Sequence, residues 1–148
     1  LQKAVARQTG AATLFQSAAH GGSLSTLSEK RMEQLDGVTD AEGTIQFDRS
    51  GQVETISLDE LVSRYGQPCF IKIDVEGAEY DVLVGAKNTL QQYKPNILLA
   101  THDCHLPGVQ KKCVTFLTEL GYYMQHTGRH NKHMAGLDDY IAIHKSIL

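Results

Sequence analysis

Two carboxylates and a histidine are the residues of this sequence whose types and spacing best suit chemistry. Asp74 and Glu76 directly follow an apolar run at residues 70–73. His102 follows a second apolar run at residues 96–101. A carboxylate or a neutral imidazole can accept the proton of a substrate hydroxyl, and either can hydrogen-bond a ligand. We therefore expect general-base or ligand-binding chemistry at these three side chains.

A structural interpretation of the acidic residues competes with this one. Glu76 and Glu79 stand at the start of a helical pattern. Negative side chains at the first turn stabilise a helix through its dipole. Spacing alone favours neither role, so both interpretations stay open.

The elements that must position these residues follow from the apolar pattern. Residues 69–74 predict a central strand, residues 78–93 a helix that ends before Pro95, and residues 96–101 a second strand. Two strands joined by one helix are typical of a parallel βαβ unit. Ligands bind at the carboxyl ends of such strands. If the two strands are neighbours, the two carboxylates and the histidine converge on one crevice.

The remaining segments predict further strands and helices. We expect a loop at residues 18–30. Residues 31–51 are expected to form a surface segment that can contain a hairpin. Ser57 is expected to cap a helix, with Glu60 as its capping-box partner. A further helix is expected after Pro107. Strands are expected at residues 1–6, 12–16, 52–57, 122–126 and 138–144. The fold class is therefore α/β, with a mostly parallel sheet and an antiparallel C-terminal edge hairpin.

Length and composition predict one ordinary globular domain. The chain has 148 residues, of which 41% are hydrophobic and 21% charged, and its formal net charge is -3. Scattered Lys and Arg residues give no basic patch for nucleic acid. No apolar run approaches the roughly 18 residues of a membrane span. The three cysteines match no paired-spacing motif, so we expect a reduced, cytoplasmic protein.

Four further polar residues are candidates for substrate binding. Ser23 and Ser25 lie in a loop rich in small residues, where serine is also a common solvated residue. Asp103 follows His102 at the end of its strand, and His130 lies in a polar loop suited to an acidic or sugar-like substrate.

The crowding of His, Asp and Cys at residues 102–105 is also typical of metal ligands. A zinc site usually has a second ligand cluster elsewhere in the sequence. His130 and His133 are the available partners, and no cysteine lies near them. We therefore assign no metal.

The stretch IKIDVEGAE at residues 71–79, followed by VLVGA at residues 82–86, resembles the FkbM family of S-adenosylmethionine-dependent methyltransferases. Segments around it agree with the family in order, and the resemblance spans nearly the whole chain. These segments lie at residues 4–10, 22–25, 55–59, 94–102 and 116–122. The resemblance implies a Rossmann-like methyltransferase sheet and methyl transfer to a hydroxyl of a sugar or natural product. It also implies that Asp74 and Glu76 lie at the catalytic crevice, with His102 as a third candidate.

One part of the family pattern is missing from this sequence. No GxGxxG-type turn follows a strand, and no ribose-binding acid is present. The chain also begins at Leu1, inside an expected strand. We therefore expect residues 1–148 to be a single partial domain that lacks its first strands. S-adenosylmethionine would bind through a region not present here, and an open strand edge would favour self-association of the isolated chain.

Three functions follow from these observations. The first is a methyltransferase that acts on a small-molecule or glycan hydroxyl, with Asp74, Glu76 or His102 as the base. The second is a non-catalytic binding module derived from the same fold. The third is a metal-dependent hydrolase that uses the same three residues.

Overall fold

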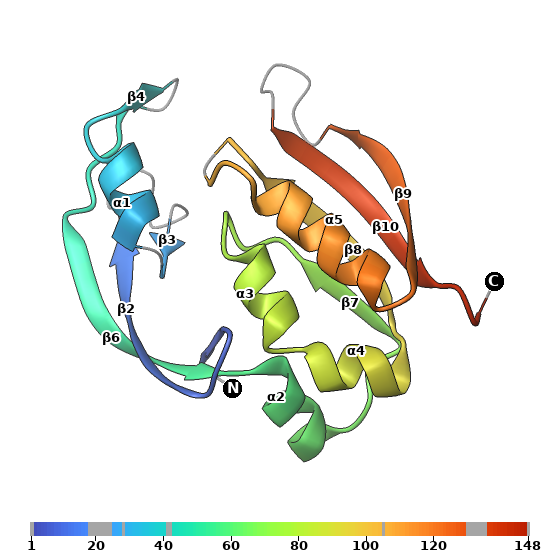
Figure 1. The fold of residues 1–148 in the computed structure, drawn as a ribbon. Coiled ribbons are helices and arrows are strands. Elements are labelled where there is room, and N and C mark those ends of the chain that lie inside the picture. Colours follow the sequence, from blue (N-terminus) through green and yellow to red (C-terminus); the bar gives the residue numbers. More distant parts are fainter. Residues whose placement is uncertain are drawn as a thin grey trace.

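Two four-stranded sheets carry the fold (Figure 1). The computed structural model describes residues 2–17, 25–27, 29–40, 43–104, 106–129 and 136–147. The first sheet has the order β1-β6-β2-β3, with bounds Ala4–Val5, Arg49–Ile56, Gly10–Gln16 and Ser25–Thr26. The second has the order β7-β8-β10-β9, with bounds Phe70–Ile73, Asn96–His102, Leu137–His144 and Tyr122–Arg129. The strands β4 and β5 form a separate hairpin, Thr39–Asp40 and Gly43–Thr44.

Helices cover one face of the second sheet, where α3, α4 and α5 lie together (Figure 1). The helices are α1 Glu29–Leu35, α2 Leu58–Tyr65, α3 Glu79–Val84, α4 Lys87–Tyr93 and α5 Val109–Glu119. Apolar side chains of α2, α3, α4 and α5 and of the second sheet form the core. The buried members of this core are Leu58, Val62, Ile73, Val82, Leu83, Ala86, Leu90, Ile97, Leu99, Val109, Cys113, Leu117, Tyr122 and Ala142.

Strand directions correct the expectation of a mostly parallel sheet. In the second sheet β7 and β8 are parallel, whereas β10 runs antiparallel to both β8 and β9. In the first sheet β1 and β6 are parallel, and the other two pairs are antiparallel. Parallel pairing requires a long crossover, and the helices α3 and α4 provide one only between β7 and β8. The predicted antiparallel hairpin at the C-terminal edge is confirmed by β9 and β10.

The strand β7 was expected to be a central strand of the complete sheet, with its flank left open in this chain because the first strands are absent. Among the described residues β7 lies at the edge of its sheet, with β8 as its neighbour. Phe70 and Lys72 are exposed while Ile73 is buried. Exposed and buried side chains therefore alternate along β7, as in a strand with one solvent-exposed face. That the domain lacks its first strands, and that the isolated chain self-associates through this edge, both stay predictions.

The single helix expected at residues 78–93 is two helices, α3 and α4. Gly85 lies between them because the backbone passes very close to the turn after β1. A Cβ atom at Gly85 would lie 2.5 Å from the carbonyl oxygen of Ala6 and 2.8 Å from that of Arg7. Asp59 then caps α4, since its carboxylate oxygens accept the backbone N–H groups of Asn88 and Thr89.

The start of α2 confirms the predicted N-cap. The Oγ atom of Ser57 accepts the backbone N–H of Glu60 at 3.2 Å, and the helix ends at Gly66 with a φ of 98°. The carboxylate of Glu60 instead pairs with Arg64 at 2.6 Å, so the second half of the capping box is not formed. In the segment from residue 25 to residue 51, the predicted hairpin is confirmed, but β3 and α1 were not expected.

Among the described residues, no helix has the length and apolar character needed to cross a membrane.

The close approach at Gly85 generates a prediction. Gly85→Ala should lower the free energy of unfolding by about 1–3 kcal/mol, because the added methyl group meets two fixed carbonyl oxygens. Helix propensity alone would favour Ala by about 1 kcal/mol, so the two effects have opposite signs. Gly51→Ala is the matched control, because a Cβ atom there meets nothing within 4 Å. Urea unfolding of both variants measures the difference, and a Gly85→Ala variant as stable as the wild type would contradict this packing.

Candidate functional site

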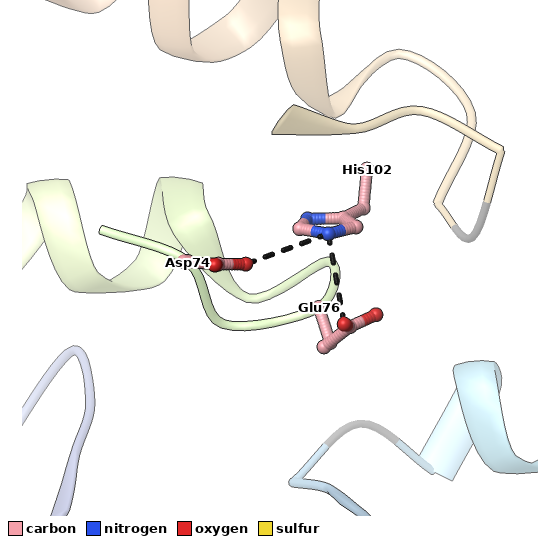
Figure 2. Close-up of side chains that lie close together, drawn as sticks. All are labelled: Asp74, Glu76 and His102. Carbon is pink, nitrogen blue, oxygen red and sulfur yellow. Dashed lines mark ion pairs between the residues drawn. The ribbon is translucent and has the colours of Figure 1, made fainter. Parts of the chain in front are cut away.

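The carboxyl ends of β7 and β8 bring the predicted catalytic residues together. These strands are parallel neighbours, with Ile73 paired to Leu99 in the last step of the register. Asp74 directly follows β7, and His102 is the last residue of β8. Figure 2 shows Asp74 and Glu76 on the turn after β7, with both carboxylates directed at the imidazole of His102. The convergence predicted from the sequence is therefore confirmed.

A strained turn places the carboxylate of Glu76. Glu76 has a φ of 55° and Gly77 a φ of 101°, and the N–H of Ala78 donates to the carbonyl of Val75 at 3.2 Å. A positive φ is uncommon for a residue with a side chain and costs of order 1–3 kcal/mol. Such a strained backbone conformation persists only where the surrounding structure holds it in place. Here the N–H of Gly77 donates to Oε1 of Glu79 at 2.8 Å, which ties the turn to the helix that follows.

The partner of His102 that sequence reasoning missed is Glu79. Its side chain is fully buried, and its Oε1 atom lies 2.6 Å from Nδ1 of His102. The sequence had suggested a contribution to the helix dipole. The missed signal is spacing, because Glu79 precedes the buried Val82 and Leu83 by three and four residues. It therefore lies on the apolar face of α3, where a carboxylate requires a buried partner.

The other ring nitrogen of His102 faces the two carboxylates on the turn. Its Nε2 atom lies 3.6 Å from Oδ1 of Asp74 and 3.7 Å from Oε1 of Glu76 (Figure 2). The imidazole is 3% exposed, whereas the side chains of Asp74 and Glu76 are 25% and 39% exposed. The second oxygen of Asp74 pairs with Lys72 at 3.0 Å. The site therefore has a buried imidazole beneath an acidic rim, which is formed by Asp74 and Glu76 and is partly open to solvent.

The charge around His102 determines its proton affinity. Burial acts to lower the pKa of His102, but the hydrogen bond to Glu79 and the charges of Glu76, Glu79 and Asp74 outweigh it, so the pKa is raised above 6.5. Nearby, burial raises the pKa of the Cys113 thiol, which keeps that thiol neutral at physiological pH. The imidazole is therefore a stronger base than a solvated histidine.

A cavity of about 280 Å³ lies against the acidic rim. Its walls come from the first sheet and from the turn after β7. They include Ser25 and Thr26 on β3 together with Asp74 and Glu76, and apolar side chains complete them. The apolar part consists of Ala4, Val5, Leu14, Leu27, Val75 and Ala78. A small ligand in this cavity would meet both carboxylates and several apolar side chains.

The structure places the four residues that were predicted to bind substrate in different surroundings. Ser25 lies in the cavity wall, which agrees with its predicted role but does not test it. The Oδ1 atom of Asp103 accepts the backbone N–H of Gln110 at 2.8 Å, so this residue caps the start of α5. Ser23 and His130 lie outside the described residues.

The same cluster is also a possible set of metal ligands. One donor atom each from Asp74, Glu76 and His102 lie within 4.8 Å of one another. Carboxylates and imidazole together suit several divalent cations. The hydrolase alternative would use this set, and nothing in the fold favours it over methyl transfer. We therefore do not assign these residues as ligands.

The described residues do not build the glycine-rich turn that holds a nucleotide-type cofactor. The glycine-bearing turn between β7 and α3 has its amides directed at protein acceptors: Ala78 donates to Val75, and Gly77 donates to Glu79. These amides are not available to a ligand.

Comparisons with known proteins agree with the resemblance seen in the sequence. The family model described as Methyltransferase FkbM domain matches residues 2–133. A crystal structure of Methyltransferase FkbM from Methylobacillus flagellatus KT has a similar fold, with a TM-score of 0.51 and 19% sequence identity. The match covers 62% of this chain and 23% of that one, so the chain spans less than a quarter of that protein's length. Among curated protein sequences, none matches this chain significantly.

The electrostatics of His102 predict how stability depends on pH. A raised folded-state pKa means that His102 contributes stability fully below its unfolded pKa of about 6.5, and that this contribution is lost as pH rises through the folded-state value. The free energy of unfolding of the wild type should therefore exceed that of His102→Asn by more at about pH 6 than at about pH 9. Denaturant unfolding of both chains measures this difference. A difference that is constant or grows with pH would contradict the charged environment described.

Proposed function

Since the chain belongs to the FkbM methyltransferase family, we propose that Asp74, Glu76 and His102 form the acceptor side of a methyl-transfer site. The acceptor is a hydroxyl group of a small molecule or glycan. One observation carries the proposal: the two carboxylates and Nε2 of His102 converge at the carboxyl ends of two parallel strands. Ligands of α/β sheets bind at this edge.

The residues of the cluster have separate tasks in this proposal. The acceptor hydroxyl enters the 280 Å³ cavity, where Ser25 and the partly exposed carboxylates provide hydrogen-bond partners. The apolar side chains of the cavity exclude water and hold the carbon skeleton of the acceptor. A base of the cluster then removes the hydroxyl proton as the oxygen attacks, and orienting the oxygen toward the donor contributes to the rate.

S-adenosylmethionine, bound mainly by residues outside the described part of the chain, would supply an electrophilic methyl group whose bond to sulfur breaks as the new bond to oxygen forms. The solved relative has a TM-score of 0.51 at 19% identity, so it supports a shared fold alone, and the choice of acceptor rests on the chemistry of the cavity.

Substitution of the two carboxylates tests the proposed function. In the full-length protein, Asp74→Asn and Glu76→Gln keep the side-chain shape and remove the charge. If the cluster orients or deprotonates the acceptor, turnover should fall by ~10²–10⁴-fold while the affinity for S-adenosylmethionine changes little. Transfer of a radiolabelled methyl group measures turnover, and calorimetry measures cofactor affinity.

Glu60→Gln provides the matched control, because this carboxylate lies on α2 and pairs with Arg64. It should keep full turnover. A purely structural role for Asp74 and Glu76 predicts the opposite pattern: near-normal turnover with a stability loss of ~0.3–1 kcal/mol. That pattern in both variants would contradict the proposal.

A further inference from the structure

A second cavity, of about 330 Å³, adjoins the 280 Å³ cavity at the acidic rim. Val5, Leu27 and Ala78 line both cavities, so the two spaces lie side by side. The strand β2 shows the same relation, because Ala12 lines the second cavity and Leu14 lines the cavity at the rim. Residues two apart share one face of a strand and lie about 7 Å from each other. One molecule of moderate size can therefore occupy both cavities.

Polar groups in the described wall of the second cavity are bound to protein partners. The two charged side chains of this wall, Arg7 and Asp81, pair with each other at 2.7 Å. The hydroxyl of Thr55 donates to the carbonyl oxygen of Gln8 at 2.9 Å. Most other side chains of the wall are those of Ala, Val and Leu. Because a buried hydroxyl without a partner costs free energy and buried carbon gains it, this cavity suits a carbon-rich group.

The cavity at the rim suits a hydroxyl group that carries no negative charge. Asp74 and Glu76 line it, and their carboxylates accept hydrogen bonds from hydroxyl groups. Among the described groups near the rim, three carboxylates face at most two cations, Lys72 and a protonated His102. The surroundings therefore repel a carboxylate or phosphate on the ligand.

We propose that the acceptor is a neutral amphipathic alcohol, whose hydroxyl group lies at the acidic rim and whose apolar part fills the second cavity. This inference rests on the proposed function, and it narrows the acceptor from hydroxyl compounds in general to those with a carbon-rich extension. A free monosaccharide would leave the second cavity unfilled. An apolar group in that cavity gains affinity from the surface that it removes from water, and it orients the hydroxyl at the other end of the molecule. Ala12 and Leu27 are then residues that determine specificity.

The first experiment measures binding and does not depend on activity. The 1,2-alkanediols from butane-1,2-diol to octane-1,2-diol keep the head group constant while the chain grows by one methylene at a time. NMR titration of the full-length protein, labelled at its Leu and Val methyl groups, gives each dissociation constant. Affinity should increase about fourfold per methylene until the second cavity is filled. The methyl signals of Val5 and Leu27 should shift on binding of the longer diols.

A matched anion tests the effect of the acidic rim. In 2-hydroxyoctanoate, a carboxylate replaces the terminal CH₂OH group of octane-1,2-diol and the chain is the same. Its affinity should be lower than that of the diol by about fivefold or more, because the rim repels the added charge.

Substitutions on β2 test the second cavity. Ala12→Leu adds carbon atoms to its wall, so it should remove most of the dependence on chain length and leave the affinity for butane-1,2-diol unchanged. Ala12→Val is a smaller change that strands accommodate well, and it should give an intermediate result. Thr13→Leu is the matched control, because Thr13 follows Ala12 on β2, points to the opposite face and is not part of either described wall. It should bind the whole series as the wild type does.

The outcomes separate this inference from the proposed function. Affinity that does not increase with chain length, or an increase that persists in both Ala12 variants, overturns the amphipathic acceptor. Equal affinity for 2-hydroxyoctanoate and octane-1,2-diol overturns its neutral character. Displacement of the long diols by S-adenosylhomocysteine also overturns the inference, because the second cavity would then hold the cofactor. Absence of methyl transfer by a wild type that binds the series as expected overturns the proposed function alone.

Discussion

The hydrogen bond between Glu79 and His102 is the interaction on which the geometry of this site depends. It joins the first turn of α3 to the end of β8 inside the core, where neither side chain contacts bulk water. Removing one member of a buried charged pair typically costs about 3–5 kcal/mol, because the other is left without compensation. The pair therefore holds the ring in one orientation and, through Gly77, holds the strained turn that bears Glu76.

The rest of the fold can be understood as the support of this pair. Parallel pairing of β7 with β8 sets the ends of the two strands side by side, and the crossover through α3 returns Glu79 to the same edge. Packing of the α3–α4 junction against the turn after β1 requires Gly85. That contact brings the first sheet toward the site, and β3 then contributes Ser25 to the cavity wall.

Local sequence signals were sufficient for part of this architecture. Apolar runs that end in Asp74 and His102 predicted two strands, and the convergence of their ends if the strands are neighbours, because strand ends and residue types are both local. Ser57 likewise predicted its cap. Long-range contacts decided the rest. The helix break at Gly85 depends on carbonyl oxygens nearly 80 positions earlier in the chain. The role of Glu79 depends on a histidine 23 residues later, which no local rule for helix starts includes.

The central claim is that the acceptor and the methyl donor meet at the cluster of Asp74, Glu76 and His102. A crystal structure of the full-length protein with S-adenosylhomocysteine and an acceptor tests it most directly. We predict that the sulfur atom faces the 280 Å³ cavity and that an acceptor hydroxyl lies between the sulfur and Nε2 of His102. A sulfur atom directed at another surface, with this cluster remote from both ligands, would contradict the account.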